Sequence, residues 1–70
     1  MLRLRRVLDI KGIKVKGFAE TIGMSEKTMY NKLMEESEFS YGEARKIKAV
    51  LPEYDIDYLL SPDSSMSVGA

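Results

Sequence analysis

Apolar residues recur along this chain at helical intervals of three and four positions, in five short segments separated by glycine, proline or polar clusters. Leu4, Val7 and Leu8 begin the pattern. No segment alternates apolar and polar residues as a half-buried strand would, so we predict an all-α fold. The first predicted helix ends at about residue 11, and the others cover residues 15–22, about 26–34, Ser40 to Pro52, and 53–60.

Start and stop signals support these boundaries. Gly12 and Gly23 each follow a predicted helix, where glycine can adopt a positive φ and close the last turn. Ser25 is a good N-cap for the third helix. Ser40 and Glu43 have the S-x-x-E spacing of a capping box, which predicts the start of the fourth helix.

The segment from about residue 15 to residue 34 has the pattern of a helix-turn-helix. Phe18 and Ile22 line one face of its first helix, and Ala19 allows the two backbones to approach closely. Met29 and Leu33, four residues apart, line one face of the second helix. The first helix begins at a weak signal, because Lys14 is a poor N-cap, so we expect packing to hold it in place.

The C-terminal half carries three further expectations. The fourth helix should place its apolar residues on and around the core face, and three tyrosines should be half-buried supports. These residues are Ala44, Ile47, Ala49, Val50 and Leu51, and Tyr41, Tyr54 and Tyr58. Residues 61–70 are small, polar and aperiodic, so we predict one domain over residues 1–60 followed by a flexible tail.

The composition is that of one small globular domain. The chain has 70 residues, of which 44% are hydrophobic and 31% are charged. It contains no Cys and no His, the commonest nucleophile, general base and zinc ligands, so we expect no enzymatic activity, metal or cofactor. No segment approaches the ~20 apolar residues of a membrane span, and no apolar stretch of a signal peptide follows the basic N-terminus. We expect a cytoplasmic protein without a membrane partner.

Charge is divided unevenly along the chain, although the formal net charge is zero. Residues 1–32 contain eight Lys or Arg and three acids, a net charge of +5. Residues 33–70 contain three Lys or Arg and eight acids, a net charge of −5. Such a division can produce a basic face that the total conceals. The alternative is that the charges serve only to keep the domain soluble.

The polar side of the third predicted helix carries side chains that can pair with base edges in the major groove. Lys27 can donate to guanine, and Asn31 can form two hydrogen bonds with adenine. Glu26 can accept a hydrogen bond from cytosine, and Tyr30 can contact a thymine methyl group. Contacts to the DNA backbone are expected from basic and hydroxyl residues and from a helix N-terminus. These residues are Lys14, Lys16, Ser25, Thr28 and Lys32.

An ordered set of positions carries a family resemblance: Phe18-Ala19, Gly23-Met24-Ser25, Thr28-Met29 and Leu33. With them, the chain from about Leu4 to Leu60 resembles the Cro/repressor-type helix-turn-helix family, also called XRE-like or lambda-repressor-like. The resemblance implies a compact five-helix domain whose third helix lies in the major groove, often as a two-fold dimer on a palindromic operator. That family usually opens its second helix with Thr-Gln, where this chain has Lys14-Val15.

These features favour a small sequence-specific transcriptional regulator that binds double-stranded DNA as a homodimer. Its size is that of a repressor from a phage or mobile element. By the resemblance, the base-reading positions are again residues 26, 27, 30 and 31. The alternative is a helix-turn-helix adaptor that binds a protein partner and contacts DNA little, which the zero net charge and the acidic C-terminal half favour.

Overall fold

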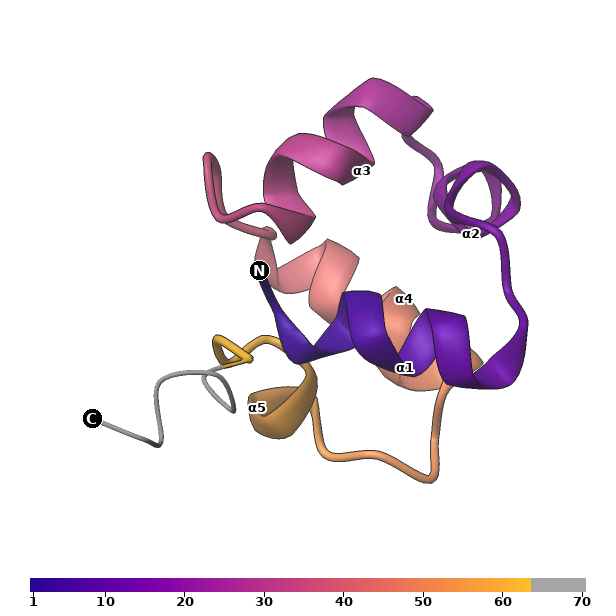
Figure 1. Cartoon of the computed structure of the whole chain (residues 1–70), viewed down its shortest axis with the longest axis vertical. Coiled ribbons are helices and arrows are strands. Elements are labelled where there is room, and N and C mark those ends of the chain that lie inside the picture. The colour runs from indigo at the N-terminus through magenta and orange to yellow at the C-terminus, as the bar shows by residue number, and fades with distance from the viewer. Residues whose placement is uncertain (64–70) are drawn as a thin grey trace.

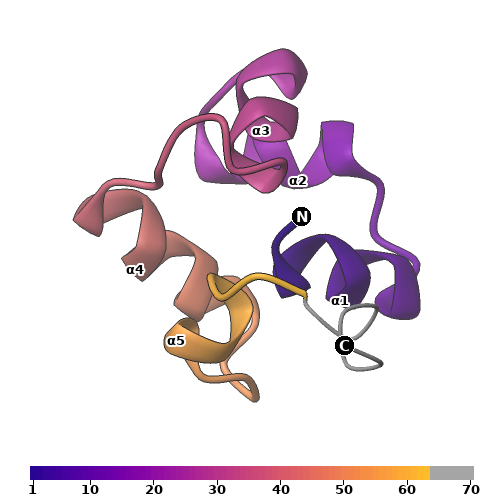
Figure 2. The same cartoon turned by 60° about the vertical axis from the view of Figure 1, so that its left-hand side comes forward.

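The computed structural model describes residues 1–63, which form five α-helices and no strand (Figure 1). The helices are α1 (Arg3–Lys11), α2 (Val15–Ile22), α3 (Glu26–Leu33), α4 (Tyr41–Val50) and α5 (Ile56–Leu59). The α2–α3 pair lies on one side of the molecule, and α1, α4 and α5 lie on the other (Figures 1 and 2). The all-α prediction is confirmed. None of the described helices combines the length and apolar character that a membrane crossing requires.

Two glycines and two serines delimit the helices as predicted. Gly12 and Gly23 close α1 and α2 with φ values of 71° and 96°, in the left-handed region. Ser25 caps α3 through its side chain. At the start of α4, the Glu43 N–H donates to Ser40 Oγ at 3.1 Å and the Ser40 N–H donates to Glu43 Oε1 at 2.8 Å, which completes the capping box.

One hydrophobic core joins the five helices. Its largest fully buried side chains are those of Phe18, Leu4, Leu8, Ile22, Met29, Leu33, Ile47, Leu51 and Leu59. Half of the eight residues of α2 are buried, and Ile13 packs half-buried against the core from the preceding loop. Each fully buried aliphatic or aromatic side chain contributes ~1.5–3 kcal/mol. Packing therefore compensates for the weak start of α2.

α4 buries less of its apolar surface than the sequence predicts. Ile47 is buried and Ala44 is half-buried, but Ala49 and Val50 are exposed. Helical geometry explains the exposure of Ala49, since each residue turns about 100° around the axis and Ala49 lies about 200° from Ile47. The core face of α4 is therefore narrow, and Leu51, just beyond the helix, completes it with 1% exposure.

The tyrosine prediction is correct for one residue of three. Tyr54 is half-buried and packs against the core. Tyr58 is 46% exposed, and its ring stacks on that of Tyr54 with centroids 6.1 Å apart. Tyr41 is 80% exposed, because it is the first residue of α4 and precedes the part of the helix that reaches the core.

α5 begins later than residue 53, where the sequence predicts it to start. The Lys48 ammonium donates to the carbonyl oxygens of Pro52 and Tyr54, at 3.0 and 2.8 Å. These carbonyls point toward α4, so the segment forms a turn and the helix starts only after Asp55.

The domain extends past the predicted boundary at residue 60. Leu2 and Pro62 form an isolated antiparallel bridge, and the Asp63 N–H donates to the Met1 carbonyl oxygen at 2.7 Å. The flexible tail predicted for residues 61–70 therefore begins too early. Its later residues lie outside the part of the chain that the structure describes.

Candidate nucleic-acid interface

α2 and α3 are joined by a short turn at residues 23–25 and pack closely against each other (Figure 1). Ala19 of α2 is fully buried, and two amide groups of the turn donate to its carbonyl oxygen at 2.8 and 2.9 Å. Met29 and Leu33 of α3 are also fully buried. The buried side of α3 therefore faces the core, and its opposite side is left open to solvent.

The four residues predicted to contact bases lie on α3. Glu26, Lys27 and Tyr30 are exposed, and Asn31 is half-buried. Their spacing of three and four positions brings them together on one side of the helix. The structure thus groups these four residues as the sequence predicts.

Ser25 and Thr28 cap the start of α3 and bond to each other. The Ser25 hydroxyl donates to Thr28 Oγ1 at 2.9 Å and accepts from the Thr28 N–H at 3.1 Å. The Thr28 hydroxyl is an acceptor in this pair, so its own hydrogen is available to an outside group. Both residues are exposed, which suits a contact with a phosphate oxygen.

Lys32 is held inside the domain rather than presented on this face. Its ammonium donates to the Glu38 carbonyl oxygen at 2.8 Å and lies 3.3 Å from Glu43 Oε1. It also lies 5.7 Å from the centroid of the Phe39 ring, and its side chain is 14% exposed. Lys32 therefore ties the loop after α3 to the start of α4, a role that the sequence analysis did not anticipate.

The eleven Lys and Arg side chains fall into two groups, those with a partner in the described part of the chain and those without one. Lys14, Lys16 and Lys27 are exposed, and within residues 1–63 their side chains form no hydrogen bond or ion pair. The other eight of the eleven Lys and Arg side chains each contact a carboxylate, a backbone carbonyl or an aromatic ring. The three uncommitted lysines all belong to the helix-turn-helix segment and its entrance, where phosphate contacts are predicted.

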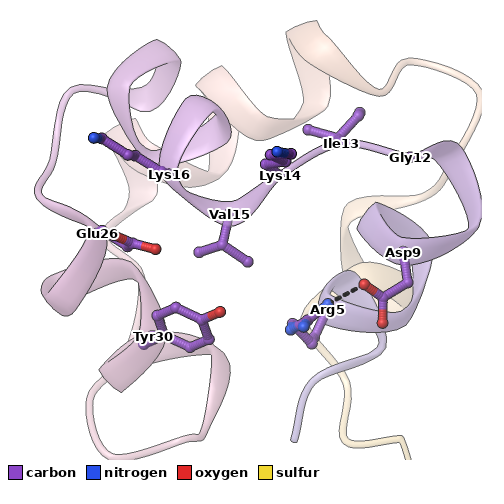
Figure 3. A pocket seen from close by; sticks show the side chains of 9 residues that line it. All are labelled: Arg5, Asp9, Gly12, Ile13, Lys14, Val15, Lys16, Glu26 and Tyr30. Carbon is purple, nitrogen blue, oxygen red and sulfur yellow. Dashed lines mark hydrogen bonds and ion pairs between the residues drawn. The ribbon is translucent and has the colours of Figure 1, made fainter.

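An open cleft of about 540 Å³ lies between α1 and the α2–α3 pair (Figure 3). It is lined by Arg5, Asp9, Gly12, Ile13, Lys14, Val15, Lys16, Glu26 and Tyr30. Three segments distant in sequence meet there: α1, the loop that leads into α2, and the start of α3. The cleft thus places α1 beside predicted DNA-contacting residues from two other elements.

Arg5 is the cleft residue that the sequence analysis missed. Its side chain is only 23% exposed, but no sequence pattern connects it to α3. Its guanidinium bonds to the Asp9 carboxylate one turn along, and this bond, with a smaller contribution from Tyr30, raises the pKa of Arg5 above its ordinary value. Arg5 therefore stays fully charged at the edge of the cleft.

Comparisons with known proteins give no family or function for this chain. No family model, curated protein or solved structure matches the chain. No group of three or more acidic, His or Cys side chains in the described part of the chain could hold a metal ion.

Proposed function

We propose that this protein is a small sequence-specific DNA-binding transcriptional regulator of the lambda-repressor-like type. The observation that carries the proposal is the position of the three uncommitted lysines. Lys14 and Lys16 flank the start of α2, and Lys27 lies in the first turn of α3. Phosphate neutralisation by such cations supplies most of the sequence-independent affinity of a DNA-binding protein.

The dimensions of α3 suit the major groove. An α-helix with its side chains is about 10–12 Å in diameter, and the major groove is about 12 Å wide, so α3 can enter it. Within it, Lys27 and Asn31 donate to purine edges, Glu26 accepts from cytosine, and Tyr30 contacts a thymine methyl group. Contacts from Lys14, Lys16, Ser25 and Thr28 to the phosphates then fix the register of α3 in the groove.

A single domain of this size contacts a short stretch of DNA, so we propose that it acts as a homodimer on a palindromic operator. Repression follows if that operator overlaps a promoter. The proposal places the protein in the cytoplasm and in the size range of phage and mobile-element repressors.

The test is selection of an operator from a random duplex library, followed by binding measurements on alanine variants. Lys27→Ala and Asn31→Ala should each lose ~1–3 kcal/mol of binding free energy and relax specificity at one base position, because each removes a direct base contact. Lys48→Ala is the matched control, since Lys48 bonds to two carbonyls of the α4–α5 turn. Equal affinities for all four proteins would contradict direct readout by α3.

A second candidate function is that of a protein-binding adaptor. It is favoured by Tyr41, which is 80% exposed beside a cleft that Arg45 and Ile56 also line. Glu35, Glu36 and Glu38, in the loop between α3 and α4, are exposed as well. Failure of the protein to bind any duplex DNA at low salt would favour the adaptor, and Tyr41 would then be the first residue to substitute in a search for the partner.

A further inference from the structure

The cleft between α1 and the α2–α3 pair has the features of an anion site. Three cations, Arg5, Lys14 and Lys16, line it together with two carboxylates, Asp9 and Glu26, so its lining has a net positive charge. The side chain of Arg5 is 23% exposed, so the protein already restricts its movement. Figure 3 shows Arg5 and Tyr30 on facing walls and Lys14 above them on the loop before α2, whereas the side chain of Lys16 extends away from Arg5.

Arg5 retains hydrogen-bonding capacity after its pairing with Asp9. A guanidinium carries five N–H donors, and one of its nitrogens, Nη1, bonds to Asp9 Oδ1. The donors that face neither Asp9 nor the Tyr30 hydroxyl are available to a second anion. The Asp9 carboxylate is itself 66% exposed, so it holds Arg5 without enclosing it.

We propose that this cleft binds one phosphodiester group of the DNA backbone. In this site Arg5 and Lys14 neutralise the phosphate, and the Tyr30 hydroxyl donates a hydrogen bond to it. α1 is then part of the interface, and Asp9 restrains the affinity by competing with the phosphate for Arg5. The inference rests on the proposed function and adds Arg5 and Asp9 to the residues that determine binding.

The first test compares arginine variants on α1 by fluorescence anisotropy, with a mixed-sequence duplex and a series of salt concentrations. Each phosphate contact contributes about −0.9 to the slope of log affinity against log salt, so Arg5→Ala should reduce that slope by about 0.9. Its loss of affinity relative to wild type should be about threefold larger at ~50 mM than at ~200 mM salt. Arg6→Ala, which removes the same charge from the same helix outside the cleft, should keep the wild-type slope.

The second test removes a negative charge instead of a positive one. Asp9→Asn removes the competing carboxylate and should tighten binding several-fold at low salt, whereas a purely structural role for the Arg5–Asp9 pair predicts weaker or unchanged binding. Asp55→Asn is the matched control, because it removes the same charge from the N-cap of α5 and keeps a good capping residue. It should leave the affinity within about twofold of wild type.

The outcomes separate this site from the proposed function. If wild type binds DNA but Arg5→Ala keeps the full salt slope, or Asp9→Asn gains no more affinity than Asp55→Asn, the phosphate site is wrong and α3 readout stands. If wild type itself fails to bind DNA at low salt, the proposed function is overturned together with the site. Thermal unfolding of each variant establishes that it is folded, and Asp9→Asn tests the site independently of Arg5→Ala.

Discussion

α2 and α4 are helices of similar length in one small domain, but they are stabilised in opposite ways. α4 begins with a complete capping box and has a single buried residue, Ile47. α2 has four buried residues among eight and begins at Lys14 without any side-chain cap. Because the first N–H groups of a helix have no intrahelical acceptor, the start of α2 remains open to an outside anion.

The lysines of α4 and those at the start of α2 also differ, in whether their side chains have a partner. On α4, Lys46 donates to the Ile22 carbonyl oxygen at 3.3 Å and Lys48 donates to two carbonyls of the following turn. At α2, Lys14 and Lys16 have no partner within residues 1–63. The lysines of α4 are thus committed to the fold, whereas Lys14 and Lys16 are free to contact an outside anion, as the proposed function requires.

Substitution of Lys14 tests most directly whether the uncapped start of α2 lowers stability and binds phosphate. Lys14 has the extended backbone of an N-cap, with φ −76° and ψ 142°, so Lys14→Ser should supply the missing cap and stabilise the domain by about 0.5–1 kcal/mol. The same change removes a phosphate contact and should lower DNA affinity. Urea unfolding and DNA anisotropy on the same preparation measure the two effects.

Lys16→Ser is the control for this prediction. It removes a lysine from the first turn of α2 without creating a cap, so affinity should fall with no gain in stability. If Lys14→Ser instead binds DNA as tightly as wild type, the open start of α2 has no role in phosphate binding.

The capping box of α4 should have a smaller effect, on how the free energy of unfolding depends on pH. The hydrogen bond from the Ser40 N–H, assisted by Lys32, lowers the pKa of Glu43. Its contribution is therefore present above the pKa of an unfolded glutamate and is lost as the pH falls through the lower, folded value. Glu43→Gln keeps the cap but cannot titrate, so wild type should lose about 0.3–1 kcal/mol more than the variant in urea unfolding between neutral and acidic pH.

Local signals predicted most of the fold. Glycine, serine and capping-box positions act within a few residues, so the ends of α1, α2 and α3 and the start of α4 agree with the sequence to within one residue. The late start of α5 and the bridge between Leu2 and Pro62 were not predictable in the same way. They depend on Lys48 reaching a later turn and on the two ends of the domain meeting in space.

The candidate site shows the same limit. Helical spacing was enough to group residues 26, 27, 30 and 31 on α3. The partner of a long side chain is decided by tertiary structure, so sequence could not show that Lys32 is tied to Glu38 and Glu43. For the same reason it could not show that Arg5 of α1 lies across a cleft from Tyr30.

The most direct test of the central claim is the salt dependence of duplex DNA binding for two triple variants with equal charge loss. The first replaces the uncommitted residues Lys14, Lys16 and Lys27 by Gln, and the control replaces Lys11, Arg45 and Lys48 by Gln. We predict that the first variant loses about 1.8 from the log–log slope of wild type through the phosphate contacts of Lys14 and Lys16, and that the control retains the wild-type slope. Equal slopes for the two variants would contradict the claim that the uncommitted lysines mark the DNA-binding face.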